Sequence, residues 1–128
     1  MAKRADVLAY AKSYYGSEEE SLWPKYPDDV VLRHSDNDGA KWYALLMKVI
    51  AKKLGLDLEG KVDIMNLKCQ PDVVDFLLEQ DGIFPAYHMN KTHWITVLLN
   101  DEIETEKVLE LLDNSYKLTA KKTKNKKS

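Results

Sequence analysis

Apolar residues recur at helical spacing in three segments of the chain, over residues 4–15, 73–78 and 105–116. The apolar positions are Val7, Leu8, Ala11 and Tyr15 in the first segment, Val73, Val74, Phe76, Leu77 and Leu78 in the second, and Val108, Leu109, Leu112 and Tyr116 in the third. Gly16 is a typical helix stop, Pro71 suits a first helical turn, and Thr105 suits an N-cap. We therefore predict three helices, the second of which buries one stripe and ends at Asp81-Gly82.

Segments rich in β-branched and aromatic residues predict strands at 30–35, 40–50, 61–69 and 93–99. The first two flank a cluster of turn residues centred on Asp38-Gly39, which predicts a hairpin. In the second strand, strict alternation places Tyr43 with Leu45, Met47 and Val49, and Trp42 with Ala44, Leu46 and Ile50 on the other face. Both faces are apolar, so we expect this strand to be central or covered on both sides. Residues 17–29 contain two prolines and allow only a short edge strand near Leu22, and residues 83–92 show no clear period.

The order helix, strands, helix, strand, helix, with a hairpin between the early strands, predicts an α+β fold. We expect a two-layer sandwich in which three main helices pack on an antiparallel sheet of about five strands. One domain would span residues 1–119, and residues 120–128 would form a flexible, lysine-rich basic tail.

Charge is unevenly distributed along the 128 residues. The formal net charge is −2, but residues 121–128 hold five lysines, so residues 1–120 have 14 Lys and Arg against 21 Asp and Glu, a net charge of −7. The longest apolar run, Tyr43 to Met47, is far shorter than the ~20 residues of a membrane-spanning helix. The N-terminus lacks the apolar core of a secretory signal, and the single cysteine, Cys69, has no partner for an internal disulfide. We expect a cytoplasmic protein.

Common catalytic and cofactor signatures are absent from the sequence, including the phosphate loop, the dinucleotide glycine fingerprint and the His-Glu-x-x-His pair. His88, His93 and Cys69 match no closed zinc pattern, and Cys69 needs no role beyond that of a small buried residue. We therefore expect no enzyme activity, no metal and no cofactor. An enzyme that uses His88 or His93 stays a third hypothesis, which requires a concave pocket at the imidazole.

Two stretches carry basic and aromatic side chains together. Residues 85–94 (PAYHMNKTHW) combine imidazole, amide, ammonium, phenol and indole groups in a loop that enters a strand, although their rings would also serve simple packing. Arg33, His34, Lys41 and Trp42 flank the predicted hairpin turn, where a wing of this kind would contact a nucleic-acid backbone. The turn itself is acidic, so such a contact would come from the strands behind it, and an ordinary solvated hairpin is the alternative.

The segments DGAKWYALL, NLKCQP and GIFPAYHMNKTHW, at 38–46, 66–71 and 82–94, resemble the MmcQ/YjbR family of small bacterial proteins. The resemblance implies a CyaY-like or secretion-chaperone-like α+β fold. Members of the family are commonly called DNA-binding because the fold is similar to a double-wing domain. The motif positions in this chain are Lys41, Trp42, Asn66, Lys68, Tyr87, His88, Asn90, Lys91, His93 and Trp94.

Two hypotheses of function follow. In the first, a basic and aromatic patch binds DNA weakly and with strong salt dependence, and its candidate residues are Arg33, Lys41, Trp42, Lys68, Tyr87, His88, Asn90, Lys91 and His93. The net charge of −7 on residues 1–120 speaks against it. In the second, a protein or peptide partner binds an exposed sheet face or edge, which predicts a contiguous apolar patch beside the loop of residues 87–94. We expect a monomer with no membrane partner.

Overall fold

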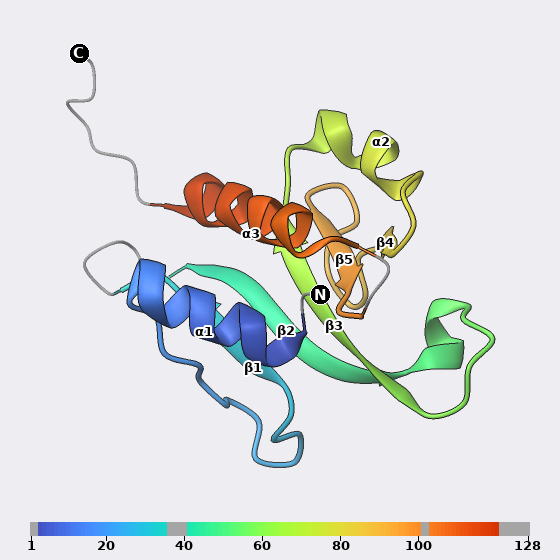
Figure 1. Cartoon of the computed structure of the whole chain (residues 1–128), viewed down its shortest axis with the longest axis horizontal. Helices are drawn as coiled ribbons and strands as arrows, with labels where there is room; N and C mark the ends of the chain where they lie inside the picture. The colour runs from blue at the N-terminus through green and yellow to red at the C-terminus, as the bar shows by residue number, and fades with distance from the viewer. Residues whose placement is uncertain (1–2, 36–40, 101–102, 121–128) are drawn as a thin grey trace.

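The computed structural model describes residues 3–35, 41–100 and 103–120. The helices are α1 (Arg4–Tyr15), α2 (Val74–Leu78) and α3 (Thr105–Thr119), with 3₁₀ turns η2 (Ala51–Leu54) and η3 (Pro71–Val73); the strands are β1 (Val30–Arg33), β2 (Trp42–Ile50), β3 (Lys61–Lys68), β4 (Ile83–Pro85) and β5 (Trp94–Leu98). The sheet order is β1-β2-β3-β5-β4 and every neighbouring pair is antiparallel. Figure 1 shows the helices on one side of this sheet. The predicted α+β sandwich of five strands and three helices is confirmed.

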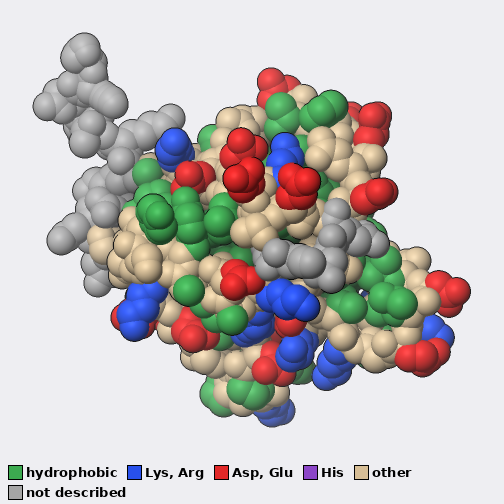
Figure 2. Space-filling model, in the orientation of Figure 1, with side chains coloured by type: hydrophobic (Ala, Val, Ile, Leu, Met, Phe, Trp, Pro, Cys, Tyr) green, Lys and Arg blue, Asp and Glu red, His purple; other side chains and the backbone are tan. Residues whose placement is uncertain are grey.

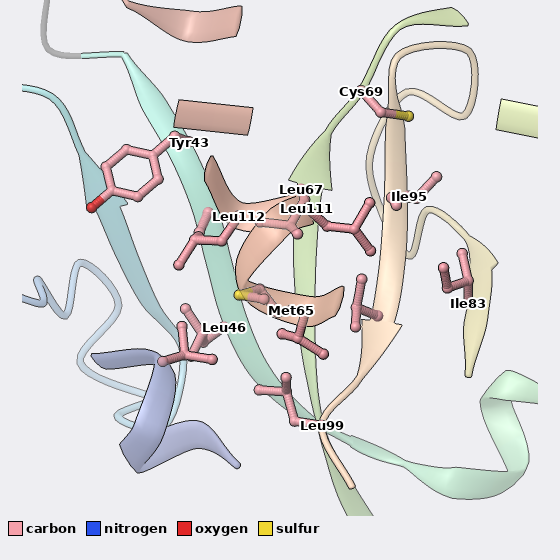
Figure 3. Close-up of a cluster of buried hydrophobic side chains, with 14 of the residues drawn as sticks. Tyr43, Leu46, Met65, Leu67, Cys69, Ile83, Ile95, Leu99, Leu111 and Leu112 are labelled. Carbon is pink, nitrogen blue, oxygen red and sulfur yellow. The ribbon is translucent and has the colours of Figure 1, made fainter. Parts of the chain in front are cut away.

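The helix face of the sheet carries the main hydrophobic core. Leu46, Met65 and Val97 lie opposite one another on β2, β3 and β5, and all three are fully buried. Side chains from the three helices close over them, among them Val7, Val74 and Leu112, and Figure 3 shows part of this cluster. A long, continuous apolar layer of this kind stabilises the fold by hydrophobic burial.

A second, smaller core lies on the opposite face, which we call the open face. Val49, Ile64 and Leu98 are buried there, and the partly buried side chains packed on them come from the chain around η2 and from Phe84 and Tyr87. No helix of three or more turns among the described residues contributes to this cluster. β2 lies inside the sheet between β1 and β3, so the prediction of a central strand is right, although its open face is covered only in part.

A β-bulge changes the alternation predicted for β2. Leu32 pairs with Ala44, but Arg33 pairs with Trp42, so Tyr43 is an additional residue on its strand. Tyr43 consequently packs in the helix-face core, where its ring meets that of Tyr116 at 4.8 Å. Trp42 instead takes the open face. The predicted faces of these two residues are wrong, because alternation alone does not reveal a bulge.

The segments around α2 also differ from the prediction. The chain after Pro71 forms one 3₁₀ turn before a short α-helix, and Phe76, predicted on its buried stripe, is 63% exposed. Residues 83–85, which showed no period, form the edge strand β4. At the opposite edge, Glu20 forms an isolated bridge with Val31, in place of a strand near Leu22.

Several sequence predictions concern single features. Cys69 is buried in the helix-face core, as expected of a small apolar residue. None of the helices in the described part of the chain is long and apolar enough to span a bilayer. The turn at Asp38-Gly39 and the lysine tail fall outside the described residues.

Candidate functional site

The open face carries a groove lined by aromatic and other apolar side chains. We call it the aromatic groove; it has a volume of about 610 Å³. Its ring-bearing residues are Trp23, Tyr26, Trp42, Tyr87 and His88, and its aliphatic and thioether side chains are Leu45, Met47, Val49, Ile50 and Met89. Because helices cover the other side of the sheet, this groove is the part of β2 that a partner could reach.

The two tryptophans reach the aromatic groove from different parts of the chain. Trp42 is the first residue of β2, and the bulge at Tyr43 directs it to the open face. Trp23 belongs to the proline-containing segment before β1, and its ring meets that of Trp42 edge-on at 5.8 Å. Edge-to-face packing of this kind holds both indoles in defined positions and leaves each one half-buried.

A cycle of hydrogen bonds, the Tyr87 anchor, fixes the other wall of the groove. The Tyr87 main-chain N–H donates to Thr96 Oγ1 at 2.8 Å, Thr96 Oγ1 donates to Asn66 Oδ1, and Asn66 Nδ2 donates to the Tyr87 carbonyl at 3.0 Å. Asn66 and Thr96 lie opposite each other on β3 and β5 and are fully buried. These two polar residues thus hold the main chain of Tyr87 on both sides.

The residue after this anchor has an unusual backbone conformation. His88 has φ +61°, in the left-handed region that non-glycine residues seldom adopt. Its ring lies 4.1 Å from the ring of Tyr87, and its side chain is exposed. Because the Tyr87 anchor fixes the preceding peptide, the strain at His88 is imposed by the surrounding structure, an arrangement that is common at binding sites.

The rest of the loop is held by its own turn. Asn90 Oδ1 accepts hydrogen bonds from the main-chain N–H groups of Thr92 at 2.8 Å and His93 at 3.2 Å. The His93 carbonyl in turn accepts from the N–H of Cys69. The Asn90 oxygen is therefore engaged in shaping the loop, and Lys91 is presented at its exposed tip.

Cationic groups line the aromatic groove from the end of the β2–β3 hairpin. Lys53 and Lys61 are exposed lining residues, whereas the ammonium group of Lys48 pairs with Asp63 at 3.0 Å. One acid, Asp29, also lines the groove. Burial raises the pKa of the Asp29 carboxyl, and the nearby Arg4 offsets this only in part. The groove therefore combines rings with a small excess of positive charge.

The acidic side chains of the molecule gather elsewhere. Figure 2 shows the helix-bearing side, where Asp and Glu cluster over α2 and α3. These elements and the 3₁₀ turn before α2 contain Asp72, Asp75, Glu106, Glu110 and Asp113. Against these five acids α3 carries two lysines, so these three elements contribute a net charge of −3 to the layer opposite the aromatic groove.

The structure brings together some of the residues that the sequence singled out. Trp42, Tyr87 and His88 line the aromatic groove, and Lys91 lies beside it with His88 in a neighbouring hollow. Arg33 instead contacts Glu20, with Nε 2.8 Å from the carboxylate.

Other candidates lie away from the groove. Lys41, Lys68 and His93 are absent from its lining, and Lys68 is only partly exposed. His34 is buried, with Nε2 2.9 Å from Thr119 Oγ1 and its ring tilted against Tyr116 at 4.2 Å. His34 is therefore a packing residue of the helix-face core.

Sequence reasoning missed several residues of the groove. Trp23 and Tyr26 lie in a segment without periodicity, where only the unusual density of aromatic residues was a signal. Lys53 and Lys61 belong to a hairpin whose position over the sheet depends on tertiary structure. Among the described residues, no group of three or more His, Cys, Asp and Glu is arranged to hold a metal ion.

Comparison with known proteins gives the family. The chain is 41% identical over 119 residues to the protein YyaQ of Bacillus subtilis (strain 168), which covers 93% of this chain and 99% of that protein. A crystal structure of a Pseudomonas syringae protein matches with a TM-score of 0.87 and 45% identity, over 91% of this chain and 98% of that one. A structure from Deinococcus radiodurans matches with a TM-score of 0.69 and 26% identity, over 92% and 78%. The YjbR family model matches residues 12–118, and the chain belongs to the YjbR family.

Proposed function

We propose that the aromatic groove binds single-stranded DNA. The observation that carries this proposal is the placement of two indoles and two phenols, with Lys53 and Lys61, on the sheet face opposite α1, α2 and α3. Proteins that bind single strands without strict sequence preference combine stacking rings with cations along the backbone path. A duplex would present few unstacked bases to these rings, so a single strand is the better match.

The charge distribution supports the same proposal. The acids of α2 and α3 are in the layer opposite the groove, and the carboxyl of Asp29 within it has a raised pKa. A DNA strand in the groove would therefore meet the ammonium groups of Lys53 and Lys61 and one carboxylate, that of Asp29. With the two ammonium groups of Lys53 and Lys61 engaged, we expect weak binding and a log-log salt slope of about −1.4.

Fluorescence anisotropy tests the proposal with a labelled thymidine oligonucleotide of about ten residues, within the usual site size of such folds. Wild-type binding should weaken by about sevenfold between 50 and 200 mM salt. Trp42→Ala should weaken binding by about tenfold or more, because base stacking contributes roughly 1–3 kcal/mol per ring. Lys61→Gln should weaken binding and flatten the salt slope by about 0.7.

A matched control is available on the other layer. Phe76 on α2 is a 63% exposed aromatic residue remote from the groove, so Phe76→Ala should leave DNA affinity unchanged. Urea denaturation of each variant separates a loss of binding from a loss of folding. If wild-type protein shows no salt-sensitive binding to the oligonucleotide, or Phe76→Ala and Trp42→Ala weaken it equally, the proposal is wrong.

A peptide partner is the second candidate, and the floor of the groove favours it. Leu45 and Val49 are buried at its base and Met47 is half-buried, so an apolar side chain would find a fitting surface. Thioether side chains adapt well to varied partners. Peptide binding would depend little on salt and would survive Lys61→Gln, and these two results distinguish it from binding of DNA.

A further inference from the structure

A second hollow adjoins the aromatic groove and differs from it in chemistry. This cationic hollow has a volume of about 410 Å³ and shares Lys53, Tyr87 and His88 with the groove. Lys91 lines only the hollow. No Asp or Glu is among its lining residues, all of which belong to the described part of the chain. Two ammonium groups and an imidazole therefore line a hollow that shares three residues with the aromatic groove.

The cationic hollow also has apolar lining residues, Leu54, Phe84 and Pro85. Phe84 is half-buried against the second core and lies opposite Thr96 of the Tyr87 anchor. Because Lys53, Tyr87 and His88 line both the groove and the hollow, a DNA strand in the groove could place its terminal phosphate in the hollow.

The groups that line the hollow are held in place by the structure around them. The Tyr87 anchor fixes the peptide before His88, and the turn closed by Asn90 fixes the chain around Lys91. Lys53 lies in η2, whose C-terminal Gly55 has φ +83° and donates to the Lys52 carbonyl. The main chain that carries these side chains is thus fixed, so binding of an anion would mainly order the lysine side chains.

Among the described residues, no acidic side chain neutralises the ammonium groups of Lys53 and Lys91. Lys52 pairs with Glu59 and Lys48 with Asp63, both at 3.0 Å, but Lys53 and Lys91 make no ion pair with a described acid. Two ammonium groups match a terminal phosphomonoester, which carries a charge of about −1.5 to −2 at neutral pH, better than a backbone diester with one charge. Positive groups at hydrogen-bond range would bind the dianion with charge-assisted hydrogen bonds.

We propose that the cationic hollow binds the terminal phosphate of the DNA strand whose bases lie in the aromatic groove, with Lys53, Lys91 and His88 as the phosphate-binding groups. This inference rests on the proposed function. It adds that the protein recognises a strand end and that the strand lies in the groove in one direction, since only one of its two ends would occupy the hollow.

The test compares three thymidine oligonucleotides of about ten residues, identical except for a 5′-hydroxyl, a 5′-phosphate or a 3′-phosphate. One of the two phosphorylated ends should tighten binding by about tenfold, since a new charge-assisted contact is worth at least that ratio. Lys91→Gln should abolish this gain and leave the affinity for the hydroxyl form unchanged. Lys52→Gln, which removes the adjacent exposed lysine that pairs with Glu59, is the matched control and should keep the gain.

The possible results separate this inference from the proposed function. If the hydroxyl form binds but neither terminal phosphate improves binding, or both improve it equally, the inference is overturned and the groove proposal stands. If no oligonucleotide binds, the proposed function fails.

If no oligonucleotide binds, a titration with inorganic phosphate followed by amide NMR tests whether the hollow by itself binds phosphate. Saturable shifts at His88 and Lys91 that Lys91→Gln removes would support a phosphate site for a free ligand, and unchanged spectra would overturn it.

Discussion

The Tyr87 anchor can be tested directly, because one substitution removes its central atom, Thr96 Oγ1, with almost no change in the shape of the side chain. Thr96→Val replaces one hydroxyl by a methyl group at a residue with no exposed surface. The substitution leaves the Tyr87 N–H and Asn66 Oδ1 buried without their partner. Each such group costs about 1–3 kcal/mol, and partial relaxation of the loop reduces the sum, so we expect a loss of about 2–4 kcal/mol of unfolding free energy.

Urea denaturation followed by circular dichroism measures this loss. With an m value of about 1–3 kcal/mol/M, the midpoint should fall by about 1–2 M without a change of slope. Thr96→Ser keeps the hydroxyl and should lose only about 1 kcal/mol from the missing methyl group. Thr92→Val, at an exposed position in the same loop, should stay within about 0.5 kcal/mol of wild type.

The comparison of the two Thr96 variants tests whether the hydrogen-bond cycle stabilises the protein. If Thr96→Val is as stable as Thr96→Ser, the hydrogen bonds of the Thr96 hydroxyl contribute nothing to the free energy of unfolding. The hydrogen-bond cycle would then not be what fixes the loop. A folded Thr96→Val protein should also bind DNA more weakly than wild type, because the walls of the groove lose their fixed position. Unchanged DNA affinity in a destabilised but folded Thr96→Val protein would contradict the proposed link between the anchor and the site.

Two further predictions concern buried groups of the helix-face core. The Tyr43 hydroxyl is buried without a well-formed hydrogen bond to a described residue, and burial raises its pKa from 10.0 to about 12, although the Ser17 side chain lowers it in part. The unfolded chain therefore ionises first, so stability present below pH 10 should fall towards pH 12 by up to about 3 kcal/mol. In Tyr43→Phe, urea denaturation should show about 1 kcal/mol more stability at pH 7 and a smaller alkaline loss; an unchanged pH dependence would refute this. Burial also raises the pKa of the Cys69 thiol, so iodoacetamide at pH 8 should alkylate it slowly in the native protein and rapidly in urea, and equal rates would contradict its position in the core.

Much of the fold can be predicted from the sequence because apolar residues recur at regular spacing in its longer helices and strands. The prediction of a helix over residues 4–15 matches α1, and the apolar stripe of α3 was equally visible. β4 has only three residues and is defined by its pairing with β5, which no local pattern reveals. Phe76 keeps a helical spacing but lies on the solvent side of a helix that is only five residues long.

The candidate site was less predictable, for reasons that the structure makes clear. The resemblance to the family was correctly recognised, and Tyr87 and His88 from the segment 82–94 line the aromatic groove. Asn66, from the segment 66–71 of the same resemblance, uses its amide to hold the Tyr87 main chain. A polar residue in a motif can therefore serve the backbone of a loop, and sequence alone does not separate that role from ligand contact.

The net charge was the main sequence argument against DNA, and the structure changes its weight. A sum over residues 1–120 treats the molecule as a point, whereas a strand near the surface responds mainly to charges within a Debye length, about 8 Å at physiological salt. Glu106 and Glu110 belong to α3, and Lys53 and Lys61 to the groove on the other side of the sheet. The sheet and its two cores separate these sets, so the acids act on the strand mainly at low salt. Their effect would be to orient the protein, with its acidic layer away from the polyanion and its aromatic groove towards it.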